Sequence, residues 1–169
     1  MKKRGFTLIE LIVVITIIGV LAAILVPALI GWVKRAKITA ANASASEVAK
    51  SMNAILADDS QYDSFTAKFT DGEYGFKSDV GTAIESIVDD ENKKMADYIS
   101  IYNDTLASEN FAIYVKDGVV VAAAAKNGKY FGTFPNVLNN RNYEKYMTVN
   151  TMQKALEVAC NEVSALQSS

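Results

Sequence analysis

Residues 6–33 read FTLIELIVVITIIGVLAAILVPALIGWV, and this stretch decides the fold of the chain. It is almost wholly apolar, carries a single charge at Glu10, and follows the basic leader Met1-Lys2-Lys3-Arg4-Gly5. About 20 apolar residues are enough for a helix to cross the hydrocarbon core of a bilayer. The longer stretch found in this chain can therefore span a membrane with some tilt. We expect a membrane-inserted helix that carries the rest of the chain.

Two ordinary explanations of residues 6–33 fit less well. A secretory signal peptide has an apolar region of about 7–15 residues that ends in a small-x-small cleavage site, whereas this stretch is longer and is not closed by such a site. A plain single-pass anchor has no use for Glu10. An ionisable side chain inside a lipid-facing segment is costly, so it points by default to a function and to a partner.

The run KKRGFTLIE, followed by an apolar helix that contains Gly19 and Pro27, resembles the N-terminus of type IV prepilins and of the related type II secretion pseudopilins. The basic leader, Gly5, Phe6 and Glu10 all stand in register with that pattern. The resemblance covers the leader and the apolar stretch. The remainder of the chain supports it only in architecture.

The resemblance implies that a membrane prepilin peptidase cuts between Gly5 and Phe6, that the new amine of Phe6 is then N-methylated, and that Glu10 serves subunit docking. The physical properties of these positions agree with those roles. A glycine before the cut places no Cβ in a tight peptidase site. After cleavage, a helix that begins at Phe6 would place Glu10 one turn inside it, where a carboxylate interacts favourably with the positive end of the helix dipole.

Pro27 interrupts the apolar helix. It has no N–H to donate to the carbonyl of Ala23, and its ring crowds the preceding turn, so we expect the helix to kink or loosen there. Gly19 weakens the same region. By resemblance to type IV pilins, this segment can unwind within a filament, and a harmless kink is the alternative.

Helix signals continue beyond the apolar stretch. The sequence KRAKITAANASASEVAKSMNAILADD is rich in alanine, lacks Gly and Pro, and repeats apolar residues at a spacing of three to four. We predict one helix from Phe6 to about Asp58. The predicted organisation is a leader peptide (1–5), a transmembrane and filament-core half of the long helix (6–33), and a soluble head (34–169) that includes the second half of the helix. Because the three leader cations are matched by Lys34, Arg35 and Lys37 on the other side, charge alone leaves the topology open; the resemblance places the leader inside.

Residues 111–134 predict three antiparallel strands. Asp117-Gly118 separates two apolar runs, 111–115 and 119–125, and favours the positive φ angles of a two-residue hairpin turn. Asn127-Gly128 then turns the chain into residues 129–134, which Pro135 ends. The fold class predicted is α+β and pilin-like: a long N-terminal helix, half of it transmembrane, packed on a small antiparallel sheet, with a C-terminal helix.

The segments around these strands are predicted as follows. Residues 58–78 form a loop pinned by its aromatic side chains, and Ser78-Asp79 cap a short helix that ends near the acidic run 89–91. That run lacks the spaced oxygen ligands of a calcium loop, so no metal site is expected. A terminal helix runs from Asn150 to about Leu166, capped by Asn150 or Thr151.

Composition argues against an enzyme. The chain has no histidine, a single cysteine, no glycine-rich phosphate loop and no nucleophile elbow, so most acid–base, metal and nucleotide sites lack their residues. No cofactor is expected. Cys160 neighbours the apolar face of the terminal helix and is expected to be a small, reduced hydrophobic residue.

Charge bears on the partners. Loss of Lys2, Lys3 and Arg4 leaves 14 basic against 19 acidic residues, a net charge of −5, which argues against a general nucleic-acid binder. Stacking of single-stranded DNA on the aromatic and basic residues of 126–134 is possible, but packing of those aromatics on the sheet is the simpler expectation.

These observations lead to one expected function and two alternatives. The chain is expected to be a structural subunit of a type IV pilus, inserted in the cytoplasmic membrane as a single-pass prepilin and then assembled into a surface filament for adhesion, twitching motility or DNA uptake. Its expected partners are copies of itself, the prepilin peptidase and methyltransferase, the pilus assembly machinery, and membrane lipid before assembly. The alternatives are a type II secretion pseudopilin, and a membrane-anchored adhesive or DNA-binding module that never polymerises.

Overall fold

The computed structural model describes residues 7–57, 69–84, 99–100, 103–135 and 149–166. The chain divides into two compact units, Met1–Ala36 and Lys37–Ser169. The predictions for Gly5, Phe6, the acidic run 89–91 and most of the loop 58–78 lie outside the described residues.

The longest element is helix α1, Leu8–Ala57. It matches the predicted helix closely, although it begins two residues later than expected because Thr7 caps it. In the second unit, its buried residues recur every three or four positions, as the sequence predicts for one inward stripe: Ala41, Asn42, Ala45, Val48, Ala49, Met52, Ile55 and Leu56.

Among the described residues the sheet has five strands, in the order β2-β1-β3-β4-β5. The strands are β1 (Gly72–Phe76), β2 (Thr82–Ala83), β3 (Asn110–Lys116), β4 (Val119–Asn127) and β5 (Tyr130–Phe134), and a short 3-10 helix, η2 (Leu106–Ser108), precedes β3. All neighbouring pairs are antiparallel except β1 and β2, which are parallel.

The predicted hairpin is confirmed. Lys116 pairs with Val119 across a turn in which Asp117 and Gly118 have φ angles of 52° and 75°, the positive values that a two-residue hairpin turn requires. The next turn differs by one residue from the prediction, because Asn127 still pairs with Tyr130 and the turn residues are Gly128 and Lys129. Strand β5 ends directly before Pro135, as expected.

The three predicted antiparallel strands are confirmed as β3, β4 and β5, and β1 and β2 extend them into a mixed sheet. The prediction that a helix starts at Ser78-Asp79 is wrong, and the rest of that predicted helix, from residue 85, lies outside the described residues. Gly81 adopts a φ of 59°, and a Cβ there would overlap the carbonyl of Glu73. The chain therefore turns at Gly81 and lays β2 beside β1. Ser78 still acts locally, since its Oγ accepts a hydrogen bond from the N–H of Val80 at 3.4 Å.

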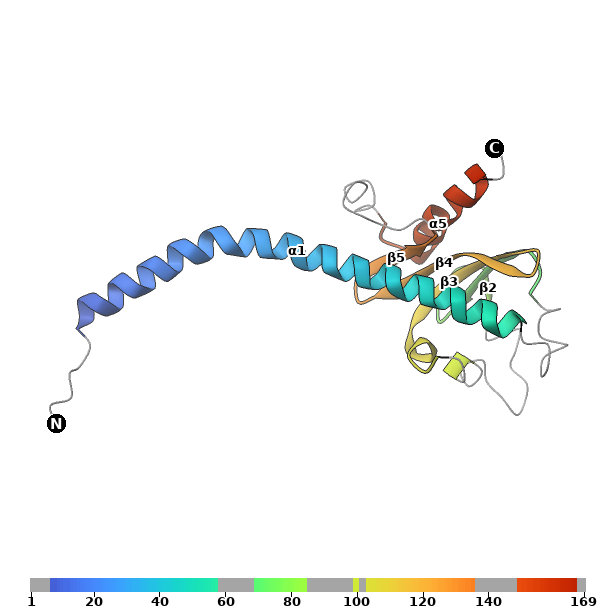
Figure 1. Cartoon of the computed structure of the whole chain (residues 1–169), viewed down its shortest axis with the longest axis horizontal. Coiled ribbons are helices and arrows are strands. Elements are labelled where there is room, and N and C mark those ends of the chain that lie inside the picture. The colour runs from blue at the N-terminus through green and yellow to red at the C-terminus, as the bar shows by residue number, and fades with distance from the viewer. Residues whose placement is uncertain (1–6, 58–68, 85–98, 101–102, 136–148, 167–169) are drawn as a thin grey trace. The chain divides into compact units, whose positions relative to one another are not determined.

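Helices cover both faces of the sheet (Figure 1). One apolar cluster, the α1 cluster, joins the second half of α1 to side chains such as Phe76, Phe111 and Ile113. The other, the α5 cluster, joins α5 (Met152–Leu166) to Ala112, Ala122, Ala124 and Phe131. Successive alanines of β4 alternate between the clusters, so small side chains let both helices lie close to the strand.

The start of α5 resolves one alternative left by the sequence. The Oγ1 of Thr151 accepts a hydrogen bond from the N–H of Lys154 at 3.3 Å, and the Thr151 carbonyl accepts one from the N–H of Ala155. Thr151 is therefore the N-cap.

The predicted loop 58–78 is wrong at residues 72–76, which form strand β1. Its aromatic residues Phe69, Tyr74 and Phe76 are nevertheless buried in the α1 cluster, as expected for side chains that pin this segment to the head.

Two asparagines of α1 bond directly to the strands. Asn53 donates to the carbonyl of Val120 at 3.1 Å and accepts from its N–H at 2.8 Å. These backbone groups lie where the β3–β4 register shifts. Asn42 accepts a hydrogen bond from the N–H of Thr133 at 2.9 Å. Beside the bond between Asn42 and Thr133, β5 approaches α1 so closely that a Cβ on Gly132 would overlap the Ala41 backbone.

Candidate functional site at the start of the long helix

Thr7 and Glu10 close the first turn of α1. Glu10 Oε2 accepts hydrogen bonds from the Thr7 N–H at 2.9 Å and from the Thr7 hydroxyl at 2.7 Å, and Thr7 Oγ1 accepts one from the N–H of Glu10 at 3.3 Å. This reciprocal arrangement is a capping box, in which two otherwise unpaired N–H groups at a helix start are satisfied by side chains.

Thr7 is not among the site residues predicted from the sequence. The signal was present, because Thr7-Leu8-Ile9-Glu10 before an apolar run is the Thr-x-x-Glu pattern of a capping box. From the sequence, Glu10 is expected to interact with the helix dipole and with a partner subunit, but not with Thr7. The structure gives it a first role within its own chain.

That first role leaves Glu10 able to bind a cation. An ionised carboxylate offers about four acceptor sites, and Thr7 uses only some of them. The predicted partner, the amine of Phe6 after cleavage, and the cleavage position at Gly5 lie outside the described residues. These assignments stay predictions.

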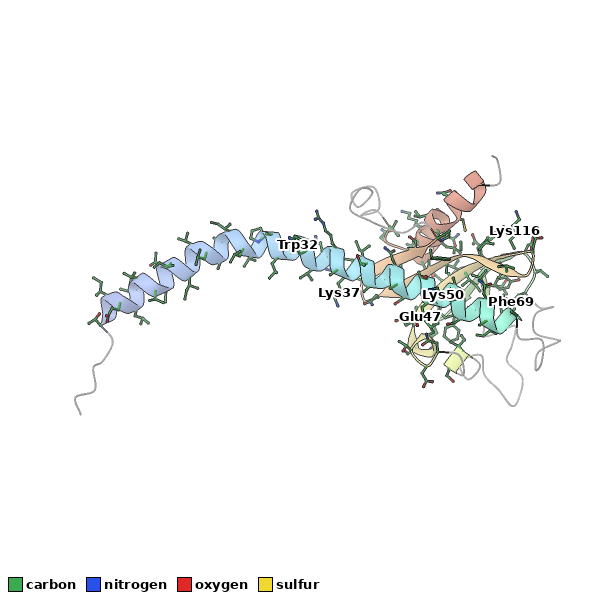
Figure 2. All side chains as sticks on the ribbon, viewed as in Figure 1. Trp32, Lys37, Glu47, Lys50, Phe69 and Lys116 are labelled. Carbon is green, nitrogen blue, oxygen red and sulfur yellow. The ribbon has the colours of Figure 1, made fainter. Side chains whose placement is uncertain are left out.

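The helix that follows the capping box is exposed on every side in the part of the chain that the structure describes. Every described residue from 7 to 33 is exposed, including Leu8 (75%), Ile24 (70%) and Trp32 (71%). Figure 2 shows side chains projecting from both sides of this part of the ribbon. By length and composition it could cross a membrane. The hydroxyl of Thr16 is satisfied internally, since it donates to the carbonyl of Ile12 at 2.8 Å.

The helix runs without a break through Gly19 and Pro27. Nothing lies within 4 Å of a Cβ built on Gly19, so the single chain gives no packing reason for a glycine there. Loosening of the helix at these two residues stays a prediction about an assembled state.

Other residues named from the sequence have structural roles in the head. Phe131 is only 8% exposed and packs in the α5 cluster, and Phe134 packs against the α1 cluster. Cys160 is half-buried beside the α5 cluster, and burial raises the pKa of its thiol to about 11, with smaller contributions from the carboxylates of Glu73 and Glu157. Both findings agree with the packing interpretations.

Comparison with known proteins identifies the N-terminal segment. Residues 1–26 match the family described as the prokaryotic N-terminal methylation motif. The chain is 39% identical over 87 residues to the type IV wide pilus major component PilA4 of Thermus thermophilus, an alignment that covers 52% of this chain and 65% of that protein. It is 36% identical over 63 residues to the type II secretion system core protein G of Pseudomonas aeruginosa, which covers 37% of this chain and 44% of that protein. No solved structure matches the chain.

The resemblance to type IV prepilins and type II secretion pseudopilins is therefore confirmed. The chain covers less than two thirds of the length of the first relative, 65%, and less than half of the second, 44%. The long apolar helix, the mixed sheet and the C-terminal helix are consistent with a pilin fold. Both relatives are structural proteins rather than enzymes.

Proposed function

We propose that this chain is the structural subunit of a type IV pilus, in which the first halves of the α1 helices bundle into the filament core and the heads form the outer surface. The observation that carries this proposal is the surface of residues 7–33, which is apolar and wholly exposed behind a capped first turn. Such a surface is stable only in lipid or against other apolar helices. A subunit held first in a membrane and then in a helix bundle meets both conditions.

Processing of the proposed prepilin follows the motif. The prepilin peptidase would cut between Gly5 and Phe6, and the new Phe6 amine would be methylated. The match of residues 1–26 to the prokaryotic N-terminal methylation motif supports both steps. Membrane insertion would precede cleavage, and the filament would extend outward from the cell surface.

Glu10 is proposed to set the position at which a subunit docks. In a helix bundle an unpaired carboxylate carries a large desolvation penalty, so a subunit enters best where Glu10 meets the positive Phe6 amine of a subunit already in the filament. Thr7 already satisfies the start of the helix within one chain. The pair with a neighbouring amine is thus available for docking and is not needed for capping.

Glu10→Gln tests this role, because glutamine can take the place of glutamate in a capping box but carries no charge. We expect Glu10→Gln and Glu10→Val to be inserted and cleaved, with filament yield lowered by about tenfold or more, since loss of one partner of a buried charge pair costs about 2–5 kcal/mol. Glu10→Asp, shorter by one methylene, should be partly impaired.

The measurement is the ratio of chain in sheared filaments to mature chain in membranes, with intact mass showing whether the chain begins at a methylated Phe6. The matched control is Thr7→Ala, which removes the cap hydroxyl and keeps the charge of Glu10. Normal filaments from Glu10→Gln would show that the charge has no part in docking. Filaments built from chains that still begin at Met1 would contradict the proposed processing.

The second candidate is a pseudopilin of a type II secretion system, favoured by the similarity to core protein G. Electron microscopy of sheared material tests the pilus against this candidate, because long surface fibres that contain this chain favour the pilus. A chain found only in membranes would favour the pseudopilin or the non-polymerising anchored module.

A further inference from the structure

The end of the apolar stretch in the first unit has an unusual composition. Between Glu10 and Lys34 the sequence contains no charged residue, and the stretch closes with Trp32, the only tryptophan of the chain, followed by Lys34 and Arg35. Trp32 is 71% exposed and Arg35 is exposed, whereas Lys34 is partly exposed. Within the part of the chain that the structure describes, neither cation forms an ion pair.

Helix geometry places these side chains at about one level and on two faces of the helix. At 3.6 residues per turn, Arg35 lies about 60° from Trp32 on the same face, whereas Lys34 lies about 160° from Trp32 on the opposite face. A protein partner would contact one face of the helix, whereas a layer of lipid headgroups surrounds it. The distribution therefore fits lipid better than a protein partner.

The position of Trp32 along the helix also fits the boundary of a membrane. Leu8 and Trp32 are separated by about 36 Å along the helix at 1.5 Å per residue, slightly more than the hydrocarbon thickness of about 30 Å. Tryptophan concentrates at the boundary between hydrocarbon and water. Lys34 and Arg35 then lie among the headgroups, where their cations meet the phosphates.

The positive charge of Lys34 and Arg35 requires a separate explanation. Cations usually concentrate on the cytoplasmic side of a membrane helix, yet with the leader inside, Lys34 and Arg35 would stand on the opposite side. Basic residues beside an apolar helix attract anionic lipid. Anionic headgroups on that side give these two residues a partner of opposite charge.

We propose that Trp32, Lys34 and Arg35 form a headgroup collar that selects anionic phospholipid and holds the unassembled subunit in the membrane. This inference rests on the membrane insertion proposed above. Transfer of a subunit into a filament would then require release of these lipids, so the anionic lipid content of the membrane would regulate the supply of subunits.

Trp32 supplies the test, because its emission reports from the collar alone. The full chain is reconstituted into vesicles of phosphatidylcholine mixed with phosphatidylglycerol, with either lipid labelled with dansyl on the acyl chain. We expect energy transfer from Trp32 to be stronger to labelled phosphatidylglycerol and to lose this preference at high salt. The preference should approach about fivefold for each cation at a strongly anionic surface.

The Lys34→Gln/Arg35→Gln double variant should show equal transfer to the two lipids. The matched control, Lys50→Gln/Lys129→Gln, removes the same charge from exposed positions of the head and should keep the preference. Equal transfer from the unaltered chain, or a preference that survives in the Lys34→Gln/Arg35→Gln variant, would overturn the proposal. Quenching of Trp32 by brominated lipid tests insertion separately, because a chain that is not inserted would show no quenching with any lipid.

Discussion

The two halves of α1 share one continuous helix and have opposite surroundings. Residues 8–36 carry long aliphatic side chains that are exposed on all sides, whereas residues 37–57 carry mostly small residues and one buried stripe. The larger side chains are thus in the half that finds no contacts within the chain. The difference shows that the first half is built for an environment outside the folded chain, and the second for the sheet.

The largest expected effect separates two glycines, one in each unit. Gly132→Ala places a Cβ against the backbone of Ala41, and neither backbone can move without disrupting the sheet or the helix. We expect the head to lose more than about 4 kcal/mol of unfolding free energy. Gly19→Ala meets no atom and should leave the head unchanged. Denaturation of the full chain in detergent, followed by the near-ultraviolet circular dichroism of its tyrosines, measures both. Equal stability of the two variants would contradict the close approach of β5 to α1.

A matched pair of truncations compares the halves directly. Met52 is 1% exposed in the α1 cluster, and Leu21 is 54% exposed. Met52→Ala should cost the head about 2–5 kcal/mol. Leu21→Ala should not change head unfolding but should lower filament yield, which is read in sheared preparations. If Leu21→Ala destabilised the head as much as Met52→Ala, the division of α1 into two kinds of surface would be wrong.

Asn53→Ala tests the polar contact between α1 and the sheet. It leaves the N–H and carbonyl of Val120 without the side chain that bonds both. A buried polar group left unpaired costs about 1–3 kcal/mol. The same denaturation experiment measures the loss, and Lys50→Ala, on the exposed side of the same helix, is the control. An unchanged unfolding curve would show that water replaces the asparagine without penalty.

The smallest expected effect is a gain of stability at Glu109. Its carboxylate bonds to Ser44, and its Oε2 is buried without a hydrogen-bond partner among the described residues. Burial raises the pKa of this carboxyl above 4.5, the charge of Glu47 raises it further, and the Ser44 bond lowers it. The folded state therefore holds this proton more tightly than the unfolded state, and the stability that it contributes is lost as pH rises from the unfolded to the folded pKa.

Glu109→Gln removes that dependence. The variant should be more stable than the native chain near neutral pH, by less than about 1 kcal/mol because solvent screens the site, and the difference should disappear in acid. Melting temperatures of the two chains across pH measure it, and a stability difference between Glu109→Gln and the native chain that does not grow as pH rises would refute the assigned pKa shift.

The sequence predicted those parts of the fold in which local signals and packing agree. Helix α1, the hairpin at Asp117-Gly118 and helix α5 follow from periodicity and turn chemistry. Strands β1 and β2 did not, because β1 contains two glycines in five residues and β2 has only two residues. Their pairing depends on the close approach of Gly81 to the backbone carbonyl of Glu73. No local sequence pattern reveals that contact.

The candidate site was predicted in part for a similar reason. Glu10 was found because a charge in an apolar stretch is conspicuous. Thr7 was not found, because it acts by bonding to Glu10. That role is visible in the sequence only when both residues are considered together. The positions of Asn42 and Asn53 against the strands could not be predicted, since periodicity shows which face of a helix is inward but not which backbone group it meets.

The bonds of Asn42 and Asn53 also attach the helix to the sheet against a pull along its axis. The two side chains are three helical turns apart, about 16 Å along the axis, and they hold different strands, β5 and β4. A pull along the second half of α1 would load both attachments in shear, together with the apolar contacts of the α1 cluster. Because both asparagines bond to backbone N–H groups, only a substitution to proline at Thr133 or Val120 would remove an attachment from the strand side.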